Sequence, residues 1–525
     1  MNAVAAAIAN GLHFSNLPQL EFQTWEHFRK TIPGKKVFLF GMGNGAEYYF
    51  DHYADVFLEG IIDNNILKQG FKANQFILSA MDDTYKNLDI FDISVLDNYR
   101  PEDIVVLITC LKSYEEIINE MELRGIEYNY VLLLMEANRL DGHAIVPQET
   151  YERYVREYCQ KEIEEKKIVF YNQEGYGGHG KYITEQLLQQ RKDLDIVWLV
   201  KDLTLEVPEG VRLVYSLNYR NFIFELETAK AWVFDYWVPT YIEKRPGQVF
   251  FQVKHWASVT LKTFGLDVAL FQKNRPHIYN SLYNSKIIDY IIVGSQFDEA
   301  SCRRGFAFDG DVYYAGSSRS DILFKPGKVK EKVFQYYGIE ETIHLLLYAP
   351  TFRAVEDHLI IGDITLDFER LRELLQNKFG GSWYILLRIH PYMAAKSSEV
   401  QRSKYVIDVS QYSDSQELVA ASDILITDYS SIMFEPAFVK KPVFLFAPDR
   451  KEYINGERKL LIEYDTLPFS ISETNEELIQ NIAAFDPETY QNKVEQFLEQ
   501  YDIHEDGHAS ERAADFILRK IEKVV

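Results

Sequence analysis

Short apolar runs that stop at polar residues recur along the whole chain, and this pattern constrains the fold more than any other feature. Residues 37–40, 168–170, 345–349 and 424–426 are such runs, and stretches with helical spacing of apolar residues lie between them. Uninterrupted runs of this length are typical of strands buried on both faces of a parallel sheet. Strands that alternate with helices predict doubly wound α/β domains, whose ligands bind where the strands end.

One strand end stands out, the sequence TDYSS at residues 427–431. The apolar run before it ends at Thr427 and Asp428, and Ser430 or Ser431 can cap a helix that begins near Ile432. The free N–H groups and the dipole of a helix N-terminus favour a phosphate there. Taken alone, the stretch fits a phosphate cradle and an ordinary capped turn equally well.

Composition narrows the functional class. The chain has 525 residues, a length that favours roughly three domains. Its net charge of −23 excludes nucleic acid as the main partner, because phosphate backbones require a basic surface. It also argues against broad adhesion to anionic lipid, although a local basic patch leaves peripheral membrane contact open. The charge and hydrophobic content are those of a soluble globular protein.

Three scattered cysteines show neither metal spacing nor a disulfide framework, which indicates a reducing compartment. The N-terminus lacks the basic region of a signal peptide, and no apolar stretch approaches the roughly 18 residues of a membrane span. We therefore expect a cytoplasmic protein, and its location at the inner face of the plasma membrane is left open.

The first third of the chain matches the dinucleotide-binding fingerprint. A strand at residues 36–40 is followed by Gly41 and Gly43, and a second strand ends at Asp63, about 20 residues later. The pattern predicts a small Rossmann-like domain over residues 1–147, with a last strand at 130–134. The segment resembles the small Rossmann-like domains appended to sugar-modifying and capsule-assembly enzymes.

Two interpretations of this domain stay open. Gly41, Gly43 and Asp63 could bind a nucleotide, or the glycines could serve only the tight turn of a module kept for packing or assembly. No catalytic Ser/Tyr/Lys set accompanies the fingerprint, so neither redox chemistry nor an NAD-type ligand is expected.

A second α/β domain is predicted over residues 148–330, beginning with a charged connecting helix. Its strand at 249–253 ends just before His255, which could act as a general base in the crevice or could simply pack. Gly177 and His179, in a glycine-rich loop after an earlier strand, and Lys262, in the loop after His255, are weaker candidates.

The third domain is predicted over residues 331–525. Arg353, Arg388, His390 and Asp428 each follow a predicted strand of one inferred sheet. Arg, His, Asp and Ser gathered at one rim suit recognition of a diphosphate, since Arg supplies a fork and Ser with backbone N–H groups supplies neutral donors.

These motifs resemble the CDP-glycerol glycerophosphotransferase family, which includes teichoic-acid and capsule polymerases. The similarity covers roughly residue 167 to the C-terminus. It is carried by residues 252–265, 316–321, 348–353, 388–391, 427–431 and 506–510, together with Tyr453 and Arg458. The resemblance implies a GT-B fold of two Rossmann-like domains with the active site in the cleft between them. It also implies that the first domain takes the acceptor, which would place Gly177, His179 and Lys262 on the acceptor side. The second domain would take the nucleotide, and a C-terminal helix at 509–523 would cross between the two.

By resemblance, His255 and His390 are the catalytic residues: His255 matches the base of the family and His390 the histidine of its HP motif. The donor diphosphate and nucleotide would be bound by Arg319, Arg353, Arg388, Thr427, Asp428, Ser430, Ser431 and Glu435. The chain departs from the family at two places. It has Lys254-His255-Trp256 where the family usually has Trp-His-Gly, and Ser318 and Ser320 replace a Pro and an Asn beside Arg319.

The predicted activity is transfer of glycerol phosphate or ribitol phosphate from a CDP-polyol to a polymer, glycan or lipid-linked acceptor, with release of CMP. No cofactor is expected to be required, and a loosely bound Mg²⁺ on the diphosphate is left open. One alternative is a GT-B glycosyltransferase that uses a nucleotide sugar. The other is a non-catalytic scaffold that senses a nucleotide through residues 41–63 and organises capsule assembly, and both activities could coexist. The polyol, the acceptor and the oligomeric state are not given by the sequence.

Overall fold

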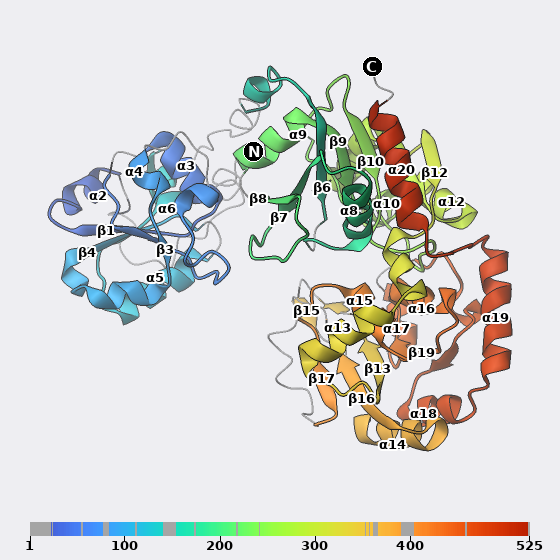
Figure 1. The fold of residues 1–525 in the computed structure, drawn as a ribbon. Coiled ribbons are helices and arrows are strands. Elements are labelled where there is room, and N and C mark those ends of the chain that lie inside the picture. Colours follow the sequence, from blue (N-terminus) through green and yellow to red (C-terminus); the bar gives the residue numbers. More distant parts are fainter. Residues whose placement is uncertain are drawn as a thin grey trace. The chain divides into compact units, whose positions relative to one another are not determined.

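The computed structural model contains three parallel sheets, each with helices beside it (Figure 1). It describes residues 23, 25–53, 56–76, 83–110, 113–139, 154–172, 175–216, 219–240, 242–351, 353–355, 358–360, 366–389, 404–456 and 459–522. The chain divides into two compact units. One is Met1–Phe170 with Asp195–Lys230 and Tyr241–Gln248, and the other is Tyr171–Leu194 with Ala231–Thr240 and Val249–Val525.

The first sheet has five parallel strands in the order β3-β2-β1-β4-β5, which is the order of a dinucleotide-binding fold. The Rossmann-like fold predicted for this part of the chain is therefore correct. Its strands are β1 (Lys36–Phe40), β2 (Gly60–Ile62), β3 (Ile90–Phe91), β4 (Ile104–Ile108) and β5 (Asn129–Val131). Its helices are α2 (Trp25–Thr31), α3 (Asn44–His52), α4 (Asp83–Lys86), α5 (Tyr114–Leu123) and α6 (Leu132–Arg139), with 3-10 turns η3 (Ala73–Gln75), η4 (Ile93–Asn98) and η5 (Pro101–Asp103).

The second sheet has seven strands in the order β12-β11-β10-β9-β6-β7-β8. The strands are β6 (Glu164–Tyr171), β7 (Asp195–Val200), β8 (Val211–Tyr215), β9 (Ala229–Phe234), β10 (Val249–Gln252), β11 (Tyr290–Val293) and β12 (Asp311–Tyr314). The helices are α8 (Gly178–Gln190), α9 (Tyr219–Thr228), α10 (Leu266–Phe271), α11 (Arg275–Ile287) and α12 (Gln296–Gly305), followed by the 3-10 helix η6 (Ser318–Phe324). The pairs β9–β10, β10–β11 and β11–β12 are parallel, so their carboxyl ends share one rim.

The third sheet has six parallel strands in the order β17-β16-β13-β18-β19-β20. The strands are β13 (Ile343–Ala349), β16 (Ser382–Leu387), β17 (Val406–Asp408), β18 (Ile424–Thr427), β19 (Val443–Phe446) and β20 (Ser470–Ser472), and β14 (Arg353–Val355) pairs with β15 (His358–Ile360) in a separate hairpin. The helices are α13 (Gly327–Tyr337), α14 (Phe368–Phe379), α15 (Ser415–Ala421), α16 (Phe434–Phe438), α17 (Arg450–Gly456), α18 (Asn475–Ala483), α19 (Pro487–Gln500) and α20 (Ala509–Glu522), with 3-10 turns η8 (Ser431–Met433) and η9 (Tyr464–Thr466).

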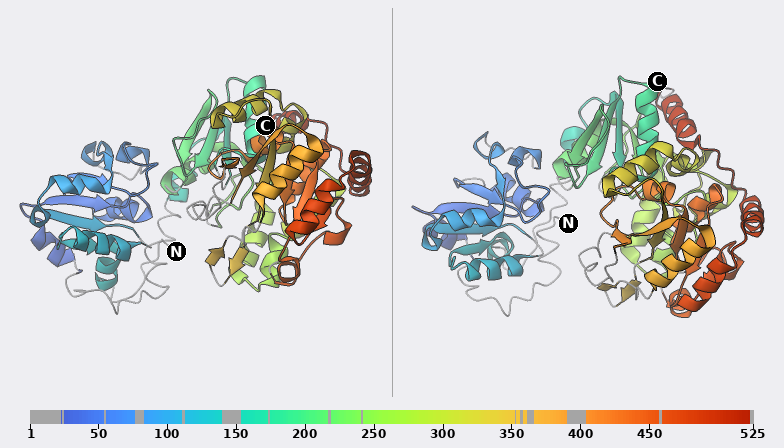
Figure 2. Two further views of the ribbon diagram at one scale, coloured as in Figure 1. Left: turned by 90° about the horizontal axis from the view of Figure 1, so that it is seen from below. Right: turned by 60° about the horizontal axis from the view of Figure 1, so that its bottom comes forward.

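Strand β13 shows why its apolar run is continuous. Leu345, Leu347 and Ala349 pack on one face of the sheet with residues of α13, α15, α16 and α19. Leu346 and Tyr348 pack on the other face with residues of α14 and α18. Figure 1 labels these helices, and Figure 2 shows the same part of the chain, coloured yellow to red, from two further sides. Because both faces are covered, neither set of side chains can be polar, and the alternating pattern of a half-exposed strand is absent.

The register of the third sheet brings three strand ends together. Tyr348 of β13 is level with Leu387 of β16 and with Ile426 of β18. Residues 349–351, 388–389 and 427–428 therefore leave the sheet side by side, as the sequence predicts for a shared rim.

The C-terminal helix predicted at 509–523 is α20. It packs against α8, and its Phe516 ring stacks on Tyr313 of β12 with the ring centroids 3.9 Å apart. The carboxylate of Asp321 accepts hydrogen bonds from the backbone N–H groups of Ala509 and Ser510 at 3.0 and 2.7 Å. Two of the free donors at the start of α20 are thereby satisfied, which fixes the helix on the second sheet.

Candidate active site

His255 is the third residue after β10, and it is exposed while its neighbours on both sides are buried. Its ring meets the ring of Trp256 edge to face, with the centroids 4.8 Å apart. The backbone of this segment is held from two other elements. Nη1 of Arg319 donates to the His255 carbonyl at 2.6 Å, and Nε2 of His179 lies 2.7 Å from the Trp256 carbonyl. The exposed imidazole is thus presented by a fixed backbone, which suits a general base.

His179, which we predicted as an acceptor-side candidate, is 3% exposed and sits in the first turn of α8. A carbonyl oxygen only accepts, so Nε2 of His179 carries the proton that it donates to Trp256. Burial, together with the charges of Lys254 and Arg319, holds the pKa of His179 well below its usual value. His179 is therefore a neutral anchor for the segment that carries His255, and direct contact with an acceptor stays a prediction.

Gly177 is the N-cap of α8, and a Cβ atom built there would meet no heavy atom within 4 Å. Gly178 next to it has φ +58°, and a Cβ atom there would lie 2.7 Å from Nδ2 of Asn172. The conformational need for glycine is therefore at Gly178, and the acceptor-side role of Gly177 stays a prediction.

Arg319 connects the two sheets of this site. Its second terminal nitrogen, Nη2, lies 3.1 Å from Oε1 of Glu435, a residue of α16 that is 1% exposed. Burial raises the pKa of Glu435, and the Arg319 charge and the Gln416 amide act against this rise. Both residues were predicted to bind the donor. Their mutual contact gives them a second, structural task, which is to connect the His255 carbonyl to α16.

The TDYSS stretch contains both a strand end and a helix cap. Oγ1 of Thr427 donates to the Ala349 carbonyl at 2.7 Å. The Asp428 carboxylate accepts from the backbone N–H of Thr351 at 2.9 and 3.0 Å and from its hydroxyl at 2.5 Å. Asp428 therefore fixes the turn that leads from β13 toward Arg353. Ser430 is the N-cap of η8, as predicted, and its Oγ accepts from the N–H of Ile432.

Ser431 contacts the segment that follows His255. Its Oγ accepts from the backbone N–H of Leu261 at 3.2 Å and lies 3.1 Å from Oγ1 of Thr260. Lys262 in the same segment donates from Nζ to the Tyr453 hydroxyl at 2.8 Å. The structure therefore brings the residues after His255 and the predicted phosphate cradle into direct contact.

The Tyr453 ring stacks on Tyr429 with the centroids 3.7 Å apart and the planes 4° from parallel. Tyr429 is fully buried, and its hydroxyl donates to Asp449 at 3.0 Å. The ring pair thus packs the middle residue of the TDYSS stretch against Tyr453 of α17, and Lys262 contacts the same Tyr453.

Two predicted donor residues, Arg353 and Arg388, and the predicted catalytic residue His390 are less completely placed. Nη1 of Arg388 donates to the carbonyls of Val409 and Tyr412 at 3.3 and 2.7 Å, so the guanidinium holds the loop after β17. Arg353 begins β14, and nothing is described of its side chain. His390 lies outside the described residues. The donor roles of Arg353 and Arg388 and the catalytic role of His390 stay predictions.

In the first sheet, side chains of the chain itself pack against the glycine-rich turn of the dinucleotide-binding fingerprint. One oxygen of Asp63, Oδ2, accepts from the Met42 N–H at 2.8 Å and lies 2.9 Å from Nζ of Lys68, which is 7% exposed. Gly41 has φ +101°, and a Cβ atom there would lie 2.3 Å from Sγ of Cys110. Gly43 is the N-cap of α3. These contacts favour the packing interpretation of the turn, and nucleotide binding at Gly41, Gly43 and Asp63 stays an untested hypothesis.

Sequence reasoning missed Glu505, on the segment before α20. Its carboxylate accepts a hydrogen bond from the Ser258 hydroxyl. The backbone N–H of Ser317 donates to both carboxylate oxygens, Oε1 and Oε2, at 3.1 and 3.0 Å. Burial raises the pKa of Glu505 to about 7. These contacts join residues about 190 to 250 positions apart, so no local pattern in the sequence predicts them. The only sequence signal that pointed to this segment was the neighbouring DGHAS motif at 506–510.

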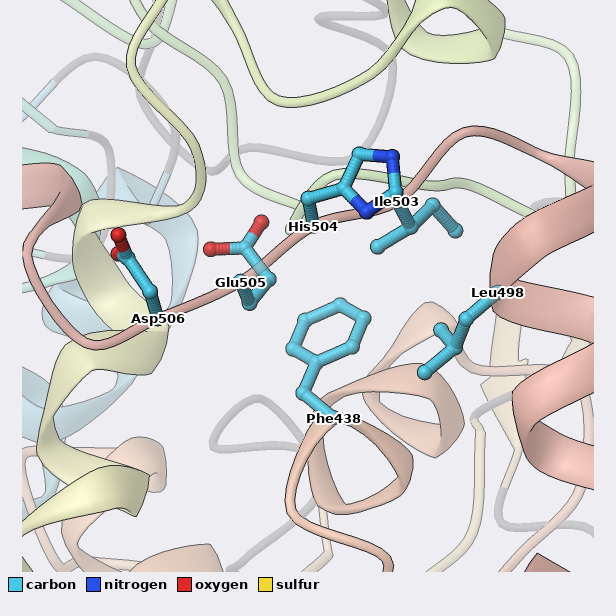
Figure 3. Close-up of a pocket in the computed structure, with 6 residues that line it drawn as sticks. All are labelled: Phe438, Leu498, Ile503, His504, Glu505 and Asp506. Atoms are coloured by element: carbon cyan, nitrogen blue, oxygen red, sulfur yellow. The ribbon is translucent and has the colours of Figure 1, made fainter.

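Glu505 also borders a cavity of about 320 Å³ (Figure 3). Phe438, Leu498 and Ile503 form its apolar side, and His504, Glu505 and Asp506 form its polar side. Among the described residues, no group of three or more His, Cys, Asp or Glu side chains is placed to hold a metal ion.

With this geometry established, comparison with known proteins identifies the family. The model of the CDP-Glycerol:Poly(glycerophosphate) glycerophosphotransferase family matches residues 153–519. The chain belongs to this family of enzymes. The resemblance drawn from the motifs is thus confirmed, and the chain is a transferase.

Relatives and solved structures agree with this family. The teichoic acid ribitol-phosphate primase of Bacillus spizizenii is 31% identical over 320 residues, which cover 58% of this chain and 79% of that protein. A teichoic acid poly(glycerol phosphate) polymerase of Staphylococcus epidermidis is 25% identical over 393 residues, which cover 72% of this chain and only 54% of that polymerase.

A structure of the wall teichoic acid polymerase TagF matches with a TM-score of 0.62 and 25% identity, over 71% of this chain and 95% of that one. The likeness confirms the predicted GT-B arrangement of Rossmann-like folds. The boundaries 1–147, 148–330 and 331–525 are not tested by it and stay a prediction.

Proposed function

We propose that the chain transfers glycerol phosphate or ribitol phosphate from a CDP-polyol to a hydroxyl group of a growing cell-surface polymer or glycan, and releases CMP. The contact of Ser431 with Thr260 and Leu261 carries this proposal, because it sets the predicted diphosphate cradle beside the segment that presents His255. A TagF variant soaked with CDPG, 25% identical to this chain with a TM-score of 0.61, supports a CDP-linked donor.

In the proposed reaction His255 removes the proton of the acceptor hydroxyl. The acceptor oxygen attacks the β-phosphorus in line, forming a new P–O bond while the bond to the bridging oxygen breaks and CMP leaves with the electron pair. The helix start at Ser430 and Ser431, with Arg353 and His390, stabilises the charge on the diphosphate and on CMP. Phosphoryl transfer depends mainly on positioning and charge stabilisation, so these residue types suffice without a covalent enzyme intermediate.

The test is release of CMP from CDP-glycerol and CDP-ribitol by the wild type and by His255→Ala, with a polyol-phosphate oligomer as acceptor. We expect the substitution to lower kcat by at least about 100-fold, because general bases contribute on the order of 10² to 10⁴. If His255→Ala released CMP near the wild-type rate, His255 would not be the general base. UDP or GDP release from nucleotide sugars, with no CMP from either CDP-polyol, would instead support the glycosyltransferase alternative.

We further propose that the acceptor is reached at a membrane surface. Among the described residues, no helix is long and apolar enough to span a bilayer. However, α10 and α11 carry four exposed apolar side chains, Leu270, Phe271, Tyr279 and Leu282, with exposed Lys273, Arg275 and Lys286 beside them. Apolar side chains mixed with cations suit shallow contact with anionic headgroups.

Sedimentation with vesicles of anionic and of neutral phosphatidyl lipids tests the membrane contact. Substituting Leu270, Phe271, Tyr279 and Leu282 by Ser should abolish sedimentation with the anionic vesicles and leave CMP release with a soluble acceptor unchanged. Equal sedimentation of this variant and of the wild type would contradict the proposal.

A further inference from the structure

Both residues by which the His255 motif departs from its family bind one carboxylate. Nζ of Lys254 lies 2.7 Å from Oδ2 of Asp298, and Nε1 of Trp256 donates to Oδ1 of Asp298 at 3.0 Å. Lys254 and Trp256 stand immediately before and after His255. A single side chain therefore holds the backbone on both sides of the predicted base.

Asp298 is itself firmly placed. It lies in the first turn of α12, where the Ser295 hydroxyl caps its N–H at 3.0 Å, and it is fully buried. Its Oδ2 also accepts from the Gly294 N–H at 2.9 Å. A buried carboxylate is tolerated only when it is paired and hydrogen-bonded, and Asp298 has an ammonium, an indole and an amide as donors.

The partners of Asp298 are equally constrained. Lys254 is 1% exposed and donates a second hydrogen bond to the Ile292 carbonyl at 3.1 Å. The Trp256 indole packs against the rings of Phe264 and Phe306, at centroid distances of 4.1 and 6.3 Å. Both side chains are buried and bound to Asp298, so the segment between them is held at both ends.

We propose that Asp298 is a positioning residue for the transfer reaction, which holds His255 at the acceptor by binding Lys254 and Trp256 together. This inference rests on the proposed role of His255. It also explains why Lys254 and Trp256 occur together: the lysine supplies the countercharge that the buried Asp298 needs, and the indole supplies the second donor. Asp298 does not itself touch substrate in this role.

Three variants separate positioning from simple stability. Asp298→Asn keeps the shape but leaves the Lys254 ammonium buried without a countercharge. Lys254→Met combined with Asp298→Asn removes both charges, so its folding cost should be smaller. Trp256→Phe removes the indole donor and keeps the Lys254 pair. Glu299→Gln is the matched control, because Glu299 is the next residue of α12 and pairs with Arg303 at 2.8 Å.

We expect kcat for CMP release to fall about 10- to 100-fold in Asp298→Asn and in the double variant, since small misplacements of a reacting group cost this much. The Kd of CDP-glycerol, measured by calorimetry, should stay within about threefold, because the predicted donor residues lie mainly on the third sheet. Glu299→Gln should match the wild type in both quantities.

Fluorine NMR of Trp256 reports on the conformation of this segment without any enzymatic turnover. With 5-fluorotryptophan in place of the six tryptophans, the fluorine resonance of Trp256 is assigned by its loss in Trp256→Phe. This resonance should shift or broaden in Asp298→Asn and stay unchanged in Glu299→Gln.

Two results would overturn the proposal. One is a shifted Trp256 resonance in Asp298→Asn with kcat within twofold of the wild type. The other is recovery of wild-type kcat in the double variant, which would mean that only the unpaired charge had mattered. If the wild type used only a nucleotide sugar, the proposed donor would be wrong, and the same variants measured with that sugar donor would still decide the role of Asp298.

Discussion

Nζ of Lys181 lies 2.6 Å from Oδ2 of Asp414, and this contact joins α8 beside the second sheet to the N-cap of α15 beside the third. Glu417 lies 2.8 Å from the same ammonium. All three side chains are at least 88% buried, with exposures of 12%, 3% and 6%. The two Rossmann-like parts of the site are therefore held together by a buried ion network in addition to apolar packing.

Replacing Lys181 by Met should lower the free energy of unfolding by about 3 kcal/mol, because two buried carboxylates lose a shared cation. Thermal unfolding followed by circular dichroism measures the change. Lys192→Met is the control, since Lys192 is exposed just after α8 and should shift the Tm by less than a degree or two. Equal Tm values for Lys181→Met and the wild type would show that the network contributes nothing net.

The carboxyl of Glu505 predicts a pH dependence of stability. Burial raises its pKa from 4.5 to about 7 in the folded chain. The folded state therefore binds more protons than the unfolded state between these values, and the stability that this group contributes is lost as the pH rises from 4.5 through about 7. Glu505→Gln should remove this loss, so its Tm relative to the wild type should be higher at pH 8 than at pH 5.

A Tm difference between Glu505→Gln and the wild type that is the same at both pH values would contradict this. Glu463→Gln serves as the control, because Glu463 is exposed at the N-cap of η9.

Asp428 is expected to act on donor binding through Thr351. Asp428→Ala frees the turn that leads to Arg353, so the KM for the CDP-polyol should rise about 10-fold while the Tm falls modestly. Initial rates of CMP release over a range of donor concentrations measure this. Asp465→Ala, which removes only an exposed partner of Arg450, should leave KM unchanged. If the KM of Asp428→Ala were unchanged, Asp428 would contribute to stability only and not to donor binding.

Arg319→Lys keeps the charge but cannot reach the His255 carbonyl and Glu435 together, because an ammonium lacks the planar fork. We expect kcat to fall about 10-fold or more, with a smaller change in the Kd of the donor. Arg303→Lys on α12 is the control and should retain wild-type kcat. Wild-type kinetics in Arg319→Lys would show that the bridge between His255 and Glu435 is dispensable.

Several elements were predictable because they depend on local pattern alone. The strands at 36–40 and 424–427 and the cap at Ser430 follow from apolar runs and from the capping chemistry of serine. The run at 130–134 shows the limit of this reasoning, since we predicted a strand where β5 ends at Val131 and α6 begins at Leu132. A short apolar run has no period that separates a buried strand from a buried helix.

The alternation of strands with helices and the family can be recognised in the sequence because both rest on contiguous motifs. The same motifs supply the candidate residues His255, Arg319, Thr427, Asp428, Ser430, Ser431 and Glu435. Only the tertiary structure decided what these residues contact. It showed that Asp63 pairs with Lys68, that Asp428 binds Thr351, and that Asp298 holds both neighbours of His255. The physical reason is that hydrogen bonds and ion pairs form between atoms brought together by the sheet register and by helix packing. Neither of these can be read from the spacing of residues along one chain.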